Sequence, residues 1–438
     1  MTAPRRRVQV AVVGAGPAGL VLANVLHRAG VPVEVRERSG RSEVEQQARA
    51  GLIEHRVVEY LREQGLADRL LAEGGRHDWC EFVCLGERVR VPYGDLSGGA
   101  RHWVYPQQFL VRDLIASYER SGGVVRFDCP VLEVDTSGPR PLVRCPDDVL
   151  EAEYVVGCDG PRSTVAQAFP ADAAASVERR YPYDWLTVLA EVDRPVDGIR
   201  YALHEAGFAG MMPRTPRLAR FYLQVPPEAD PEDWTEARIR EQLSLRLQLG
   251  AGDPEPGAVT EVGMLRLRGR VREHVRAGRL LLAGDAAHVL TPSGAKGLNL
   301  AVADVADLAE TLLRRHRDAG GDGADGGDGD GGDEAALAGY DRRRHQAAWT
   351  AQEFSDRLLD LLHLPPGDAA ESAFGLRLRR ERVARLTAAG PEGESFARAY
   401  GGAGHLLPAH APGSEEVVDP GPPRGAPTAT GRAGVAPR

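Results

Sequence analysis

Three glycines near the start of the chain have the spacing that binds the diphosphate of a dinucleotide. Gly14, Gly16 and Gly19 follow an apolar run at residues 8–13, typical of a buried parallel strand, and a helical pattern continues to about residue 27. The first glycine permits the tight turn, the second lets a phosphate approach the backbone, and the third lets the helix pack on the strand. We therefore expect a dinucleotide to bind at this helix N-terminus.

An acidic residue after a second strand completes this pattern. Residues 31–35 are apolar, and Glu37 lies about twenty residues after the glycines, where such a side chain commonly holds the adenosine ribose. A glycine-rich turn alone is weak support, because unrelated α/β proteins also use it. The pattern predicts a bound dinucleotide but does not separate FAD from NAD.

Two later apolar runs are each followed by a carboxylate. Residues 155–157 precede Asp159, and residues 280–283 precede Asp285. Ligands of open α/β sheets bind at the carboxyl ends of the strands, so both aspartates are placed to meet a cofactor. Asp285 can accept a hydrogen bond from a ribityl hydroxyl group.

These segments, with the loop at 292–299, resemble the signatures of the flavoprotein aromatic hydroxylases, the group A FAD monooxygenases. The likeness is greatest to the para-hydroxybenzoate hydroxylase family and runs from about residue 8 to residue 407. It implies an enzyme that holds FAD, takes electrons from NADH or NADPH, and uses O2. The implied reaction hydroxylates 4-hydroxybenzoate beside its phenol, giving 3,4-dihydroxybenzoate, and the implied assembly is a cytoplasmic homodimer.

The resemblance also implies which residues meet FAD. They are Gly14, Gly16, Gly19, Glu37, Arg49, Gln107, Asp159, Arg220, Asp285, Lys296, Gly297, Leu298 and Asn299. Arg220 is expected to support movement of the flavin between positions. The amides of the loop that opens the helix near residue 296 are expected to stabilise reduced, anionic flavin.

The substrate side is implied in the same way. The residues expected at the substrate are Trp185, Tyr201, Gly210, Met212, Arg214 and Tyr222. Those expected in catalysis are Tyr201, Tyr400, His77 and, through its backbone carbonyl, Pro292. Arg214 would clamp the substrate carboxylate, with the Tyr222 hydroxyl as a second donor. Tyr201 would bond the phenol, whose proton would leave through Tyr400 and His77.

Two positions depart from the family in the substrate pocket. Met212 stands where the family has a serine hydroxyl near the carboxylate, and Gly210 replaces a larger apolar side chain. A lost donor weakens the carboxylate clamp, and a lost side chain is expected to add room. The alternative substrate is therefore a substituted 4-hydroxybenzoate, for example 3-amino-4-hydroxybenzoate, in a biosynthetic pathway.

A third departure concerns the nicotinamide donor. Glu43 and Gln47 stand where NADPH users of the family place tyrosine and arginine. A carboxylate disfavours a 2′-phosphate, so NADH is expected over NADPH, although Arg38 and Arg41 lie nearby.

The predicted fold class is α/β, α+β overall: a Rossmann-like FAD-binding domain, a mixed antiparallel-sheet substrate domain and a C-terminal helical region. The expected FAD-binding domain covers 1–178, of which 79–104 join the substrate sheet, and the chain returns to this domain at 274–317. The substrate-binding sheet domain lies between them at 179–273. An acidic Gly-Asp flexible linker at 318–334, the helical region at 335–407 and a disordered tail at 408–438 are expected to follow. Helices are expected at 238–249, 298–316, 334–363 and 371–386.

Charge and cysteine usage bear on the partners. The formal charge is −9, and the segment 318–334 supplies seven acidic residues and no basic one. The nearly neutral remainder argues against nucleic acid or an anionic membrane and favours a small aromatic acid as partner. Five cysteines without a C-x-x-C pair are interpreted as reduced thiols, and no metal-binding spacing is present.

Two other classes of function compete with the hydroxylase. A flavin-dependent oxidase or halogenase is one, but a halogenase needs a catalytic lysine away from the flavin. Lys296, the only lysine, lies in the flavin loop. A flavin-binding, non-enzymatic regulator is the other, and the sequence offers it no sensory or DNA-binding segment.

Overall fold

The computed structural model describes residues 5–47, 51–320, 329–364 and 369–402. Its helices are α1 (Pro17–Arg28), α2 (Arg41–Gln46), α3 (His55–Glu63), α4 (Asp68–Glu73), α5 (Tyr93–Leu96), α6 (Gln107–Arg120), α7 (Thr164–Gln167), α8 (Glu236–Leu247), α9 (Lys296–Gly320), α10 (Gly329–Leu362), α11 (Ala369–Arg385) and α12 (Pro391–Tyr400). Short 3-10 turns lie at Pro231–Asp233, Gly284–Ala286 and Pro292–Gly294.

An eight-stranded sheet carries the glycine-rich turn. In order it contains β19 (Arg276–Ala277), β20 (Leu280–Leu282), β11 (Val149–Gly157), β1 (Arg5–Val13), β2 (Val33–Arg36) and β8 (Val124–Arg126), with β10 (Leu142–Arg144) and β9 (Glu133–Asp135) attached beside β11. The strands from β20 to β8 run parallel. Strand β1 is buried from Val10 to Val13, because helices cover both faces of a parallel sheet. The predicted Rossmann-like architecture is confirmed.

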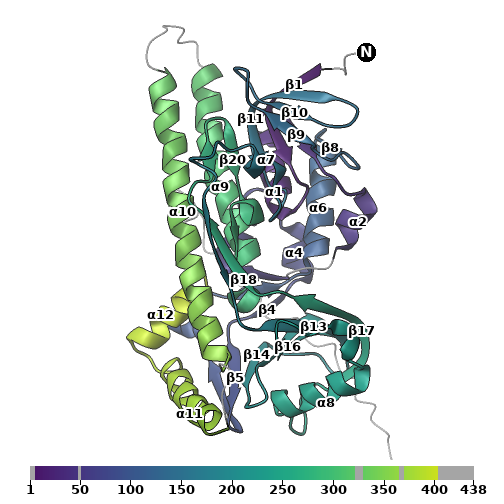
Figure 1. The fold of residues 1–438 in the computed structure, drawn as a ribbon, viewed down its shortest axis with the longest axis vertical. Coiled ribbons are helices and arrows are strands. Elements are labelled where there is room, and N and C mark those ends of the chain that lie inside the picture. The colour runs from purple at the N-terminus through teal and green to yellow at the C-terminus, as the bar shows by residue number, and fades with distance from the viewer. Residues whose placement is uncertain (1–4, 48–50, 321–328, 365–368, 403–438) are drawn as a thin grey trace, which may run out of the picture. The chain divides into compact units, whose positions relative to one another are not determined.

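A seven-stranded sheet forms the second layer of the protein. Its order is β17 (Pro256–Leu265), β13 (Asp184–Val192), β16 (Leu218–Val225), β15 (Ala209–Thr215), β14 (Ile199–Leu203), β5 (Cys80–Cys84) and β6 (Glu87–Val91). All neighbours are antiparallel except β14 and β5. Helix α8 covers one face through Ile239, Leu243 and Leu247 (Figure 1). Aromatic side chains of the other face share a core with α10, α11 and α12.

Two small sheets join these layers. One has the order β3 (Leu52–Glu54), β7 (His102–Val104) and β4 (Gly75–His77), and the other has β12 (Ser176–Arg180), β18 (Arg268–Arg272) and β21 (His288–Val289). Of the segment 79–104, β5 and β6 therefore enter the seven-stranded sheet, whereas β7 pairs with β3 and β4. The chain thus leaves the seven-stranded sheet and joins the small sheet of β3 and β4 at β7.

Helices α9 and α10 run side by side along the eight-stranded sheet (Figure 1). They are longer than the sequence predicts, since α9 ends at Gly320 and α10 begins at Gly329, both within the expected linker. An established helix gains one backbone hydrogen bond for each added residue, so it can extend beyond the residues that form its apolar face. Residues 321–328 and the expected tail at 408–438 lie outside the described residues.

Candidate active site

The glycine-rich turn has the shape that a dinucleotide diphosphate needs. Gly14 has a φ of +106°, and a Cβ there would lie 2.6 Å from the carbonyl carbon of Cys158. A Cβ on Gly19 would overlap the Gly14 carbonyl oxygen and lie 3.1 Å from a Val12 methyl group. A Cβ on Gly16 would meet nothing within 4 Å. The first and third glycines are therefore required by the protein itself, and the second borders open space.

Glu37 is fixed at the mouth of this turn. One carboxylate oxygen accepts from the Ala15 amide at 2.7 Å and the other from the Ser39 amide at 2.9 Å. Each carboxylate oxygen has two acceptor positions, so two remain for ribose hydroxyl groups. The structure places this side chain where the sequence pattern expects it.

The turn that carries Asp285 is anchored from α9. Buried Asp304 accepts from the Gly284 amide at 2.9 Å, from Arg344 Nε at 2.8 Å, and is bonded to His288 Nε2 at 2.7 Å. Burial alone would raise the pKa of Asp304, but His288 and Arg344 hold this pKa below its usual value. Among the described residues the Asp285 carboxylate has no hydrogen bond, so it is available to a ligand.

The start of α9 is tied to two other elements. Lys296 Nζ donates to Glu54 at 2.6 Å and to the Tyr400 carbonyl at 2.8 Å. Asn299 Oδ1 accepts from the Glu54 amide at 2.9 Å. Burial lowers the pKa of Lys296, while Glu54 opposes the shift. Both side chains bind protein, so the groups of this turn that remain for a cofactor are its backbone amides, beside which a Cβ on Gly297 would meet nothing within 4 Å.

The remaining residues expected at FAD are distributed as follows. Gln107 begins α6 and is half-buried, and Leu298 is buried in the core of the eight-stranded sheet. Asp159 accepts from the Thr164 amide at 2.7 Å, while its second oxygen is buried without a partner among the described residues. Arg49 lies outside the described residues. The open glycines, the unpartnered Asp159 oxygen and the available Asp285 fit a dinucleotide cofactor.

Two tyrosine hydroxyls meet on the aromatic face of the seven-stranded sheet. The Tyr201 and Tyr400 oxygens are 2.9 Å apart, and Tyr201 also donates to the Ser293 carbonyl at 3.3 Å. The Pro292 carbonyl, expected at this place, instead accepts from the Ala295 amide at 3.0 Å. Burial raises the pKa of Tyr201 and of Tyr400 above the ordinary value, so both hydroxyls are protonated at neutral pH.

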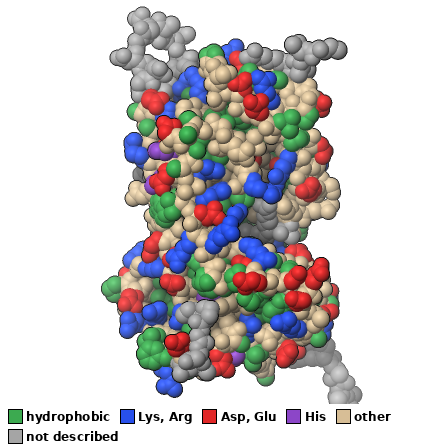
Figure 2. All heavy atoms as spheres, viewed as in Figure 1, with side chains coloured by type: hydrophobic (Ala, Val, Ile, Leu, Met, Phe, Trp, Pro, Cys, Tyr) green, Lys and Arg blue, Asp and Glu red, His purple; other side chains and the backbone are tan. Residues whose placement is uncertain are grey.

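Two guanidinium groups lie near each other beside Tyr222. Burial and the neighbouring Arg220 lower the pKa of Arg214, whose guanidinium lies against Gly51. Arg220 donates to Glu261 at 3.1 Å. Burial raises the pKa of Tyr222, and both arginines oppose that shift. On the side of the molecule that Figure 2 shows, basic side chains also gather between the regions of the two large sheets. This arrangement suits a bound carboxylate.

An aromatic wall lines the sheet between these groups. Trp185 lies with its ring 5.0 Å from both the Phe208 and Tyr222 rings. A Cβ on Gly210 would lie 3.0 Å from Phe208 Cζ. The expectation that Gly210 adds room is therefore wrong, because Phe208 fills that space. Half-buried Met212 packs against this wall and pairs with the Arg220 position.

His77 does not bond Tyr400 within the described residues. Its ring Nδ1 lies 3.0 Å from the hydroxyl oxygen of Tyr93, which also donates to the His77 carbonyl at 2.7 Å. The same oxygen lies 2.9 Å from His102 Nδ1. The His102 ring contacts the Tyr400 ring edge to face, with centroids 5.1 Å apart. Tyr93 and His102 therefore occupy the space between Tyr400 and His77.

Several of these residues have little signal in the sequence. Tyr93 and His102 lie on different elements, and nothing local relates them. The roles of Phe208 beside Gly210 and of Ser293 beside Tyr201 depend on contacts between segments that are distant in the sequence. Glu54 is the exception, because a charged residue that follows apolar Leu52 and Ile53 before a helix indicates a buried ion pair.

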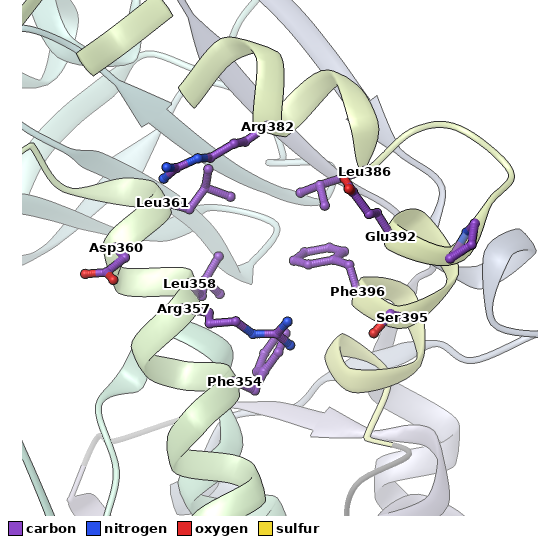
Figure 3. Close-up of a pocket in the computed structure, with 11 residues that line it drawn as sticks. Phe354, Arg357, Leu358, Asp360, Leu361, Arg382, Leu386, Glu392, Ser395 and Phe396 are labelled. Atoms are coloured by element: carbon purple, nitrogen blue, oxygen red, sulfur yellow. The ribbon is translucent and has the colours of Figure 1, made fainter. Parts of the chain in front are cut away.

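A pocket of about 590 Å³ lies among α10, α11 and α12 (Figure 3). Phe354 and Phe396 line it together with Arg357 and Glu392. The Phe396 ring stacks on the Tyr400 ring with centroids 5.3 Å apart. The pocket thus shares a wall with the tyrosine pair.

A cluster of two cysteines and an aspartate lies near Glu37, whose carbonyl accepts from the Cys129 amide at 2.8 Å. The ligand atoms of Cys129, Cys145 and Asp148 are within 4.8 Å of one another, and all five cysteines are free thiols. Arg36 donates to Cys129 Sγ at 3.1 Å and to Asp148 at 2.9 Å, so a cation already lies among these atoms.

No helix in the described part of the chain has the length and apolar character needed to cross a membrane.

The chain thus joins a parallel sheet with a glycine-rich turn to an antiparallel sheet that bears aromatic and basic side chains. The family model described as FAD binding domain matches residues 7–355, and the chain belongs to this family of FAD-dependent aromatic monooxygenases. It is 31% identical to the p-hydroxybenzoate hydroxylase of Acinetobacter baylyi over 82% of this chain and 86% of that protein. It is 28% identical to a rifampicin monooxygenase of Streptomyces venezuelae over 82% of this chain and 73% of that protein.

Solved structures with this fold include enzymes that act on different substrates. The p-nitrophenol 4-monooxygenase of Pseudomonas putida matches with a TM-score of 0.70 at 21% identity, over 87% of this chain and 98% of that chain. An aklavinone-11 hydroxylase in complex with FAD and aklavinone matches with a TM-score of 0.65 at 27% identity, over 81% of this chain and 69% of that chain. The chain is therefore a flavoprotein enzyme that binds FAD, whereas its relatives differ in substrate.

Proposed function

We propose that this enzyme hydroxylates 4-hydroxybenzoate beside its phenol, giving 3,4-dihydroxybenzoate. The proposal rests on three residues that lie side by side on neighbouring strands. Tyr201 of β14 pairs with Gly210 of β15, which pairs with Tyr222 of β16. Neighbouring strands lie about 4.8 Å apart, so the two tyrosines stand about 10 Å apart. This span suits a benzene ring with a phenol at the Tyr201 end and a carboxylate at the Tyr222 and Arg214 end.

Bound FAD, once reduced, supplies the activation of O2. The chain's own residues orient the ring and move its proton. Arg214 and the Tyr222 hydroxyl would bind the carboxylate and thereby fix which ring carbon faces the flavin. Tyr201 would accept a hydrogen bond from the phenol and pass the phenolic proton to Tyr400. Loss of that proton raises electron density at the carbon beside the phenol, where hydroxylation occurs.

The test supplies purified holoenzyme with NADH, O2 and a set of phenolic acids. With 4-hydroxybenzoate we expect NADH oxidation to accelerate and 3,4-dihydroxybenzoate to be identified by mass spectrometry. NADH oxidation that no phenolic acid accelerates would rule out the proposed reaction. The alternative substrate, 3-amino-4-hydroxybenzoate, is included because Met212 offers the carboxylate no hydroxyl donor. A higher kcat/KM for that compound would identify it as the substrate.

Tyr201→Phe should bind 4-hydroxybenzoate but couple its reaction poorly. The variant loses the hydroxyl that lies 2.9 Å from Tyr400, while the ring remains to pack. Proton transfer by a positioned group contributes about 10²–10⁴-fold to rate, so hydroxylation should slow by at least about a hundredfold. Hydrogen peroxide and hydroxylated product are measured for each NADH consumed. Full conversion of NADH into hydroxylated product would remove Tyr201 from the proton path.

We also propose NADH as the preferred electron donor. Glu43 is exposed on α2, and Arg41 is engaged by Glu45 at 3.0 Å and by Glu119. A 2′-phosphate would thus meet a carboxylate at Glu43 and an arginine that already has acidic partners. We expect kcat/KM for NADH to exceed that for NADPH by about tenfold, a difference of about 1.4 kcal/mol. Equal values for the two nucleotides would contradict the preference.

A further inference from the structure

We propose that Cys129 and Cys145 form an oxidation site, at which hydrogen peroxide closes a reversible disulfide. The two residues lie at the two ends of one hairpin, because Cys129 precedes β9 and Cys145 directly follows β10. Hydrogen peroxide is the product when reduced flavin reacts with O2 and no substrate is hydroxylated. The inference goes beyond the proposed hydroxylation and does not depend on which aromatic substrate the enzyme takes.

The two sulfur atoms lie close together in the folded protein. The Sγ atoms of Cys129 and Cys145 and a carboxylate oxygen of Asp148 are all within 4.8 Å of one another. The Leu132 amide donates to the Arg144 carbonyl at 2.9 Å, which holds the ends of the hairpin together just inside the two cysteines. A disulfide has a sulfur–sulfur distance of about 2.05 Å, so the sulfur atoms need to approach by less than about 3 Å.

The surroundings of the two thiols assign them different roles. Cys129 is half-buried, and its sulfur accepts a hydrogen bond from Arg36 at 3.1 Å. Partial exposure and an arginine beside the sulfur are typical of cysteines that react with peroxide. Cys145 is buried, and burial, followed by its contact with Cys129, raises the pKa of its thiol above the ordinary value. Cys129 is therefore the thiol that reacts first, and Cys145 keeps its proton until the second step.

The reaction takes two steps that balance without a further reagent. The Cys129 sulfur attacks one oxygen of hydrogen peroxide, the O–O bond breaks, and the other oxygen leaves as water with the thiol proton. The product is a sulfenic acid, S–OH, on Cys129. The Cys145 sulfur then attacks the Cys129 sulfur, and the S–O bond breaks as hydroxide leaves with the Cys145 proton as water. Each sulfur gives up one electron, and the peroxide takes both.

The disulfide is expected to act on the cofactor site, because Cys129 is tied to the segment that carries Glu37. The Cys129 amide donates to the Glu37 carbonyl at 2.8 Å, and the Gly14 amide donates to the Arg36 carbonyl at 2.7 Å. Moving Cys129 toward Cys145 therefore pulls on the backbone of Glu37, whose carboxylate is expected to hold the adenosine ribose. It also takes from the Arg36 side chain its sulfur acceptor.

Treatment of the holoenzyme with hydrogen peroxide tests the site. After catalase removes the peroxide, the protein is unfolded in excess maleimide, and mass spectrometry counts the labelled thiols. The wild type should lose two of its five thiols, and peptide mapping should find Cys129 joined to Cys145. Dithiothreitol should restore both thiols. Retention of all five thiols, or a crosslink between other cysteines, would overturn the site.

Serine variants separate the roles of the two thiols. In Cys145→Ser no disulfide can form, so Cys129 should stop at the sulfenic acid, which dimedone labels. Cys129→Ser should keep all of its remaining thiols. Cys84→Ser is the matched control, because Cys84 is buried in the seven-stranded sheet and its thiol donates to the Leu376 carbonyl at 3.5 Å. This control should still form the disulfide, whereas loss of thiols from Cys129→Ser at the wild-type rate would contradict the assignment.

The affinity for FAD measures the effect on the cofactor site. Fluorescence of the FAD released on dilution of the holoenzyme gives the Kd before and after peroxide treatment. We expect the Kd of the wild type to rise at least about fivefold, the lower end of typical coupling between two sites. Dithiothreitol should reverse this rise, and Cys129→Ser treated in the same way should show none. An equal Kd in the reduced and disulfide forms would overturn the coupling to FAD.

Discussion

Gly16→Ala should fold normally and lose affinity for FAD. The added methyl group meets no protein atom within 4 Å, and Gly16 has a φ of −75°, which alanine adopts readily. It would occupy the space where the diphosphate approaches the backbone. Overpacking costs about 1–3 kcal/mol, so the Kd for FAD should rise by about ten- to a hundredfold. Quenching of flavin fluorescence on titration of the apoprotein measures this Kd.

Gly19→Ala provides the contrast, because the same methyl group there would overlap the Gly14 carbonyl. Backbone cannot move aside as a flexible side chain can, so the Tm of the Gly19→Ala apoprotein should fall by several degrees. The Tm of the Gly16→Ala apoprotein should match wild type. An FAD affinity unchanged by Gly16→Ala would show that the diphosphate does not lie against this turn.

Arg214→Ala should raise the Kd for 4-hydroxybenzoate by at least about a hundredfold. Removing one partner of a buried ion pair costs about 3–5 kcal/mol, because the other charge is left without compensation. Arg220 also lies in this region, but Glu261 already engages it at 3.1 Å. Perturbation of flavin absorbance on titration with 4-hydroxybenzoate measures the Kd without turnover.

Two further variants separate charge from geometry at this position. Arg214→Lys keeps the charge but loses the two-point contact, so its Kd should lie between those of Arg214→Ala and wild type. Arg217→Ala removes an exposed arginine from the same hairpin and should bind as wild type does. A Kd unaffected by Arg214→Ala would place the carboxylate elsewhere.

Local patterns predicted the FAD-binding half well. Gly14, Gly16 and Gly19 lie in one turn, and Glu37 reaches the same turn from the next parallel strand, so their geometry follows from spacing along the chain. Helix ends were less predictable. The acidic composition of 318–334 indicated a linker, whereas backbone hydrogen bonds continue α9 to Gly320 and begin α10 at Gly329.

Contacts between distant segments were beyond local patterns. Phe208 fills the space beside Gly210, which only the register of β15 with its neighbours reveals. Tyr93 and His102 come from a short helix and a three-residue strand, and each alone is an ordinary buried polar residue. The Tyr201 hydroxyl donates to the Ser293 carbonyl and not to the carbonyl of Pro292, because the 3-10 turn directs the Pro292 carbonyl to the Ala295 amide. Such one-residue differences depend on the local backbone path.

Lys296 connects the start of α9, where the cofactor is expected, to β3 and to the end of α12. Its ammonium group holds Glu54 of β3 and the carbonyl of Tyr400, the last residue of α12, while its backbone begins α9, whose first turn is expected to meet the flavin. A displacement of that helix end is therefore transmitted to the backbone that carries the Tyr400 hydroxyl. We therefore expect FAD binding at the first turn of α9 to order Tyr400, and the apoprotein should hold Tyr400 less rigidly than the holoenzyme does.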